Sequence, residues 1–137
     1  MYKDSHGRDV PFTPEEFLRL LIRSELATKE ESAALLAEFR EVYLKSTWLP
    51  DSITAFCSYL VGAGHLTTWQ CAKLRQGQWK GFYLGGFELL DLVSIDEEKF
   101  SHYLARNTGD DAIVRLAITP PARANGHDIE YRVVERF

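Results

Sequence analysis

Apolar residues recur with helical spacing over the first half of the chain. Thr13-Pro14-Glu15-Glu16 is typical of a helix start, because threonine caps free amides, proline suits the first turn and Glu16 can return the bond as a capping box. The predicted helix runs to about Ser24. Its broad apolar stripe consists of Phe17, Leu18, Leu20, Leu21 and Ile22.

Three further helices follow by the same signals. Thr28 with Glu31 repeats the capping box and opens a longer helix through Tyr43, which Pro50 ends. Asp51 is suited to cap a third helix, stopped by Gly62 or Gly64, and Thr67 to cap a fourth that ends at Gly77.

The helical half matches itself at an offset of 39 residues. The matched pairs are Phe17 and Phe56, Leu21 and Leu60, Ile22 and Val61, Thr28 and Thr67, Ala33 and Ala72, and Leu35 and Leu74. One hairpin leaves its apolar face uncovered, so the repeat predicts a duplicated helical hairpin in a four-helix arrangement.

After Gly85-Gly86 the spacing of the apolar residues is no longer helical. Short apolar or alternating runs then predict a four-stranded antiparallel meander, with strands over 87–93, 100–106, 112–119 and 129–136. So small a sheet must cover its apolar face, and we expect the helices to do so in one α+β core. Without that cover the sheet needs a second chain, and a homodimer is the alternative.

These patterns divide the chain into three segments. We expect a flexible N-terminal tail over 1–12, a helical subdomain over 13–86 and a β subdomain over 87–137. The length of 137 residues suits one domain or two small subdomains sharing a core.

Charge and composition narrow the function classes. The net charge is −4, and the whole acidic excess lies in residues 87–137, with 6 basic and 10 acidic side chains. An acidic surface repels phosphate backbones, which disfavours nucleic-acid binding. The sequence contains no apolar run of membrane-spanning length and its start does not resemble a secretory signal, so we expect a cytoplasmic protein with no membrane contact.

No spacing in the sequence indicates a metal or catalytic site. His6, His65, His102 and His127 are scattered, and Cys57 and Cys71 are better explained as core residues. We therefore assign no catalytic, cofactor-binding or metal-ligating residues. The one basic and aromatic cluster spans 69–83, and nucleic-acid binding through it is the alternative function.

Three stretches resemble a known family. Leu66 to Cys71, Trp79 to Gly85 and Phe87 to Asp91 are similar to the helical extension and the entry to the kinase domain in bacterial serine/threonine protein kinases of the planctomycete type. Weaker matches at Tyr103 to Arg106 and Thr119 to Ala124 extend the resemblance over about residues 13 to 124. It implies that the second half is a fragment of a kinase N-lobe.

The chain departs from the family at positions whose residues phosphoryl transfer requires. A kinase needs flexible glycines over the phosphates and a strand lysine, but here Ser94, Asp96 and Lys99 stand near the glycine positions and Ala117 at the lysine position. No catalytic loop follows in the sequence given.

The expected function is therefore a non-catalytic interaction or regulatory module, not an enzyme. Its partner is a protein, for which a related kinase is a candidate. Trp79, Phe82 and Tyr83 are the expected contact surface, since aromatic side chains are enriched at interfaces.

Overall fold

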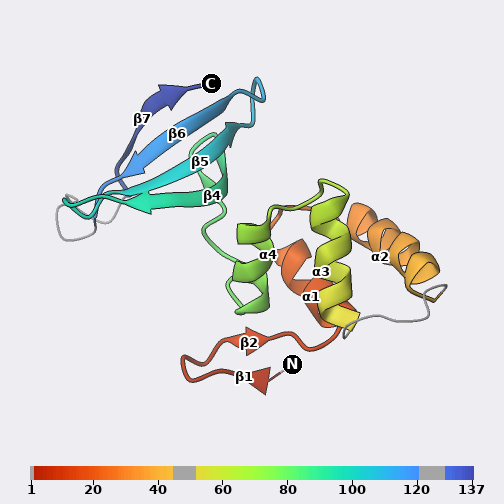
Figure 1. Cartoon of the computed structure of the whole chain (residues 1–137). Helices are drawn as coiled ribbons and strands as arrows, with labels where there is room; N and C mark the ends of the chain where they lie inside the picture. Colours follow the sequence, from red (N-terminus) through yellow and green to blue (C-terminus); the bar gives the residue numbers. More distant parts are fainter. Residues whose placement is uncertain (1, 45–51, 121–128) are drawn as a thin grey trace. The chain divides into compact units, whose positions relative to one another are not determined.

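Over the residues that the structure describes, the chain is an α+β protein with four helices and two antiparallel sheets (Figure 1). The computed structural model describes residues 2–44, 52–120 and 129–137. The chain divides into two compact units, residues 1–81 and 82–137, and each is described by itself.

The first unit holds the helices α1 (Pro14–Arg23), α2 (Lys29–Leu44), α3 (Ser52–Gly62) and α4 (Thr68–Arg75). The caps expected at three of them are confirmed: the side chains of Thr13, Thr28 and Thr67 accept bonds from the amides three residues on, at 3.2, 3.1 and 3.1 Å. The expected cap of α3, Asp51, and the stop at Pro50 lie outside the described residues.

The two inter-helix turns repeat at the same offset as the sequence. Glu25 and Gly64 both have positive φ, 66° and 79°. Each donates its amide to the carbonyl three residues back, Ile22 or Val61, at 3.1 Å. The sequence marks the left-handed position only at Gly64, because glutamate gives no such signal.

The helical core is built on three phenylalanines. Phe17 and Phe56, which match at the 39-residue offset, are both fully buried and meet edge to face with ring centroids 5.9 Å apart. Phe39 from α2 packs on Phe56 at 5.0 Å. Helix α1 contacts α2, α3 and α4. None of the helices in the described ranges is sufficiently long and apolar to span a membrane.

Residues 1–12, expected as a flexible tail, contain a hairpin instead. Strand β1 (Tyr2–Lys3) pairs with β2 (Asp9–Val10). The Asp4 carboxylate accepts bonds from the amides of His6 and Arg8, both at 2.9 Å, and Gly7 supplies a φ of 76°. An aspartate that caps its own turn is a local signal for a turn, and the polar composition of this segment gives no strand pattern beside it.

The second unit is one five-stranded sheet in the order β3-β4-β5-β6-β7. Its strands are β3 (Tyr83–Leu84), β4 (Phe87–Ile95), β5 (Ser101–Asn107), β6 (Ile113–Ile118) and β7 (Tyr131–Arg136). The antiparallel meander is confirmed, but the expected number of four strands is wrong. The fifth is β3, which turns through Gly85-Gly86 to pair with Phe87 and Glu88.

The sheet curls, and one apolar face turns inward. Leu89, Ala105 and Val114 are consecutive cross-strand partners on this face, and all three are buried. Tyr131 of the edge strand β7 reaches Phe87 in β4, with ring centroids 6.1 Å apart in an edge-to-face arrangement. The sheet thus covers much of its own apolar face. The expected cover by the helices stays a prediction.

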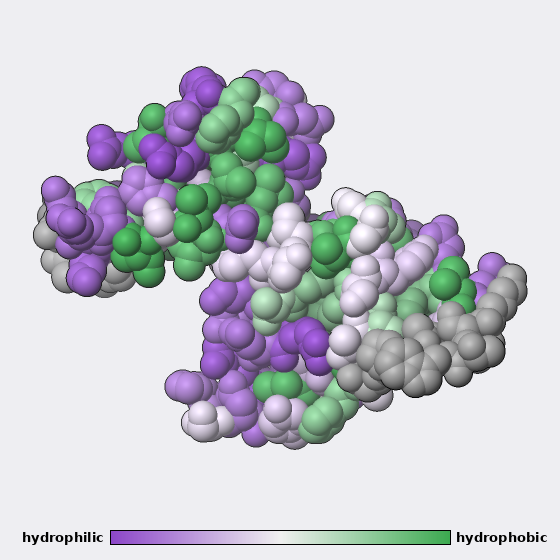
Figure 2. Space-filling view, viewed as in Figure 1, coloured by the Kyte–Doolittle hydropathy of each residue, from purple (hydrophilic) through white to green (hydrophobic). Residues whose placement is uncertain are grey.

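Apolar side chains also remain on the surface of this unit. Val93, Ile95 and Phe137 are 50%, 58% and 68% exposed. Figure 2 shows green apolar patches between purple polar ones on this unit, coloured by hydropathy.

Gly85 is required by the curl. A Cβ at this position would collide with the Tyr131 hydroxyl, and the φ of 57° is strained for any other residue. We expect Gly85→Ala to lower the free energy of unfolding by about 2–3 kcal/mol, measured by urea denaturation.

Gly86→Ala is the matched control, because nothing lies within 4 Å of a Cβ there, and it should change stability by less than about 0.5 kcal/mol. Adding Tyr131→Phe to Gly85→Ala should recover part of the loss. Equal losses in the free energy of unfolding for Gly85→Ala and Gly86→Ala would contradict this account of the curl.

Candidate functional site

The three residues expected to form one contact surface do not lie in one unit. Trp79 belongs to the helical unit, whereas Phe82 and Tyr83 begin the sheet unit. Phe82 is 2% exposed, so its side chain is interior and its place in an exposed surface is a wrong prediction. Tyr83 is 39% exposed in the edge strand β3.

Two cationic side chains contact the ring of Trp79. The Arg23 guanidinium carbon, from the end of α1, is 4.0 Å from the ring centroid, and Lys80 Nζ is 4.8 Å from it. We call these three residues the Trp79 patch. Beside the ring is a surface depression of about 310 Å³, lined by Arg8, Gly77, Gln78, Trp79 and Lys80.

The turn that places Trp79 depends on Gly77. Its φ is 82°, and a Cβ there would stand 2.6 Å from the carbonyl oxygen of Asp9 in the N-terminal hairpin. The hairpin at residues 2–10 therefore helps to position the Trp79 patch.

The remaining members of the basic and aromatic cluster at 69–83 are separated. Lys73 Nζ lies 6.0 Å from the ring of Trp69, on α4. Arg75 lines a different depression, between α3 and α4. The structure does not bring residues 69–83 together as a single basic surface.

The segment 93–99, which stands where the resemblance implies a glycine-rich loop, is a closed hairpin end. Asp96 Oδ1 accepts the amides of Glu98 and Phe100, both at 3.0 Å, and Oδ2 lies 3.0 Å from His102 Nε2. Lys99 takes the left-handed position, with a φ of 73°. The hydrogen bond to His102, followed by those to the two amides, lowers the pKa of the Asp96 carboxyl.

Ala117, at the expected lysine position, is 1% exposed. It lies in β6 between His102 of β5 and Arg132 of β7. Arg115, two residues earlier, has its Nε 3.6 Å from Oε2 of Glu135. A buried methyl group therefore stands at this place in the sheet.

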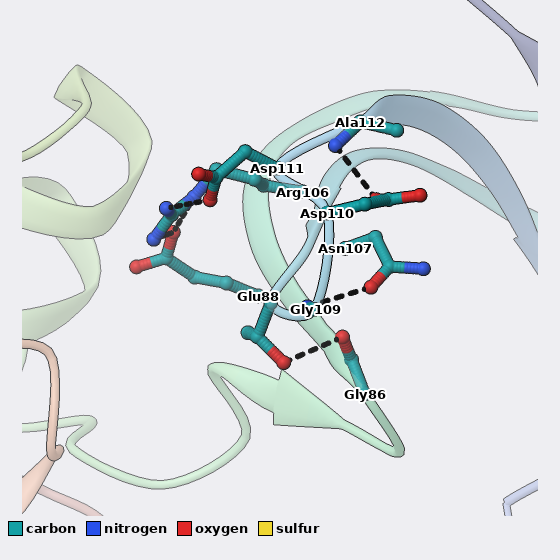
Figure 3. Close-up of polar contacts among 9 residues, drawn as sticks. Gly86, Glu88, Arg106, Asn107, Gly109, Asp110, Asp111 and Ala112 are labelled. Carbon is teal, nitrogen blue, oxygen red and sulfur yellow. Dashed lines mark hydrogen bonds and ion pairs between the residues drawn. The ribbon is translucent and has the colours of Figure 1, made fainter.

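An ion-pair network holds the other end of the sheet (Figure 3). Arg106 donates from Nε and Nη2 to one Glu88 oxygen, at 3.1 and 2.9 Å, and from Nη1 to Asp111 at 2.8 Å. Glu88 and Arg106 are direct cross-strand partners. The hydrogen bond and charge of Glu88 raise the pKa of Arg106.

The loop beside this network is held by its own side chains. Asn107 accepts the amide of Gly109 at 2.8 Å, Asp110 accepts the amide of Ala112 at 2.9 Å, and Thr108 donates to the Gly86 carbonyl at 3.0 Å. Arg106 is matched by two carboxylates, so its positive charge is balanced within the sheet unit. Only the strand register places Glu88 opposite Arg106, so the sequence pattern could not reveal the pair.

Metal-ligating residues do not gather in the described ranges. Within residues 2–44, 52–120 and 129–137, no group of three or more His, Cys, Asp or Glu side chains could hold an ion. His127 lies outside these ranges. Cys57 and Cys71 are both buried, as expected for core residues.

Comparison with known proteins does not add a relative: no family model, curated protein or solved structure matches the chain.

The Asp96 hairpin gives a pH-dependent prediction. The folded-state pKa of Asp96 lies below its ordinary value of 3.8, so its contribution to stability is present above that value and is lost as pH falls through the folded pKa. We expect Asp96→Asn to be less stable than the wild type near neutral pH, with the difference narrowing below about pH 4.

The measurement is urea denaturation across this pH range, with Glu97→Gln as the control. Glu97 is a neighbouring exposed carboxylate on the same hairpin. A constant difference between Asp96→Asn and wild type at every pH would contradict the role given to the carboxylate.

Proposed function

We propose that this chain is a non-catalytic protein-interaction module, related to the bacterial serine/threonine kinases that its sequence resembles. The observation that carries the proposal is the closed hairpin end at 93–99, together with the buried methyl group of Ala117 in the neighbouring strand. We also propose that it acts in the cytoplasm.

The argument against nucleotide binding is electrostatic. A triphosphate is held by backbone amides and cations. Here the amides of Glu98 and Phe100 already donate to a carboxylate of the same hairpin. Asp96, Glu97 and Glu98 add three negative charges to the hairpin end. These charges would repel the negatively charged phosphates of a nucleotide.

The Trp79 patch is the contact surface that we favour. Tryptophan and arginine are enriched among residues that dominate binding energy at interfaces. Arg23 and Lys80 give the patch two positive charges, so it favours a partner with acidic side chains. A related kinase stays the candidate partner, and a second copy of the chain is the alternative.

A nucleotide titration tests the non-catalytic part. We expect no saturable binding of magnesium ATP up to about 1 mM, the upper range of typical KM values, in calorimetry and in amide chemical shifts. Shifts that saturate in residues 93–99 and at Ala117 would overturn the proposal, because they would show that the hairpin opens to hold phosphates.

Partner capture tests the contact surface. We expect Trp79→Ala to lose the proteins that wild type retains from extract of its own cells, with a drop of at least about 10-fold in bound amount, as for a hot-spot residue worth 1.4 kcal/mol or more. Val42→Ala is the control, since Val42 is a 56% exposed apolar residue on α2 of the same unit.

Equal capture by both variants would show that the contact surface does not include Trp79. Capture of nucleic acid in place of protein, removed by nuclease treatment, would favour the nucleic-acid alternative. Recovery of only the chain itself would identify the homodimer.

A further inference from the structure

The N-terminal hairpin brings a third cation to the Trp79 patch. Arg8 lines the depression of about 310 Å³ beside the ring, together with Lys80 and the turn at Gly77. A Cβ added at Gly77 would lie 3.2 Å from the Cβ of Arg8, so the Arg8 side chain starts at this turn. Residues far apart in the sequence therefore bring cationic groups to one small depression.

The hairpin also positions the head of Arg8. Asp4 accepts a hydrogen bond from Nε of Arg8 at 3.0 Å, and Nη2 of Arg8 lies 3.4 Å from Nδ1 of His6. A guanidinium has five N–H donors, so these two contacts use two of them at most. The Arg8 side chain is 33% exposed, which leaves it accessible to a ligand.

Arg23 lies near the hairpin as well as over the ring. The pKa of Asp9 is lowered mainly by the hydrogen bond from Lys3, and the charge of Arg23 lowers it further. The contact of Arg23 with Trp79 is a cation–π contact, which orients a cation without neutralising its charge. The ring thus holds this guanidinium in place while its charge persists.

The depression is cationic on a chain whose net charge is −4. Asp4 offsets Arg8, and Asp9 offsets Lys3 at 2.9 Å. Arg23 and Lys80 add two further positive charges beside the ring. A concave surface lined by charges of one sign concentrates its field and attracts an ion of the opposite sign.

The charge of this depression suits a phosphate monoester better than a carboxylate. A carboxylate carries one negative charge, whereas a phosphorylated side chain carries about −1.5 to −2 at pH 7 and offers three acceptor oxygens. Guanidinium groups match phosphate oxygens with paired hydrogen bonds, and an ammonium group binds phosphate as a point charge. We propose that the Trp79 patch, together with Arg8, binds a phosphorylated side chain of the protein partner. This inference rests on the proposed function, which supplies the partner and the contact surface.

Peptide libraries of random flanking sequence test the site. The central position holds either phosphorylated serine, threonine and tyrosine in equal parts, or glutamate. We expect the full chain to bind the phosphorylated library at least about 10-fold more tightly in fluorescence anisotropy, a difference of about 1.4 kcal/mol. Equal affinity for the two libraries would overturn the proposal.

Charge variants connect the preference to the depression. Arg23→Gln and Lys80→Gln should each weaken binding of the phosphorylated library about 10-fold, the scale of a hydrogen bond to a charged group. Lys80→Arg should retain binding, because it keeps the charge. Lys29→Gln is the matched control, since Lys29 is an exposed cation of the same unit that does not line the depression. An equal loss in Lys29→Gln would show a general effect of charge and would count against the site.

A small probe locates the bound group. In NMR titrations, N-acetyl-phosphoserine amide should shift the indole Nε1–H of Trp79 with saturation, and N-acetyl-glutamate amide should shift it far less. Shifts confined to other residues would contradict the proposal. So would binding to phosphatidylserine vesicles or to a single-stranded oligonucleotide without any preference for phosphorylated peptides, because the ligand would then be a membrane or a nucleic acid.

This inference and the proposed function fail separately. A protein that wild type captures and Trp79→Ala loses, with unchanged capture after phosphatase treatment of the extract, would support the contact surface and overturn the phosphate site. Preference for the phosphorylated library that persists in Trp79→Ala, Arg23→Gln and Lys80→Gln would instead place the phosphate site elsewhere and overturn this inference.

Discussion

The sheet unit depends on a contact between its first turn and its last strand. Tyr131 can reach Phe87 only because Gly85 has no side chain in the way and supplies a positive φ. An antiparallel sheet with one apolar face needs a cover, and curling lets it provide part of that cover from its own strands. The inward row of Leu89, Ala105 and Val114 is the product of this closure. The opposite face is free to carry polar pairs such as Glu88 with Arg106.

Local signals were the part of the fold that the sequence could predict. The caps at Thr13, Thr28 and Thr67 are fixed by side chains within three residues, so pattern alone locates them. Glu25 shows the limit, since this glutamate takes the left-handed position that the sequence marks only at Gly64. Strand β3 was missed because two residues are too few for a period, and its pairing depends on the turn at Gly85.

The candidate site was harder to predict than the fold. Trp79 and Phe82 are close in sequence, but the boundary between the units falls between them and Phe82 is buried. Arg23, which stacks on Trp79, comes from the end of α1, and no short-range pattern links these two residues. By contrast, the sequence itself shows that residues 93–99 contain no glycine. The bond from Asp96 to His102 required the register of β4 and β5.

The contact between Tyr131 and Phe87 also bears on the order in which the sheet forms during synthesis. Strands β3 to β6 are each made next to the strand they pair with, so the meander can grow as the chain leaves the ribosome. Tyr131 belongs to the last strand, yet its ring packs on Phe87 near the first. During synthesis the contact between these two rings is therefore absent until Tyr131 emerges. Until then Phe87 lacks the aromatic partner that it has in the finished sheet.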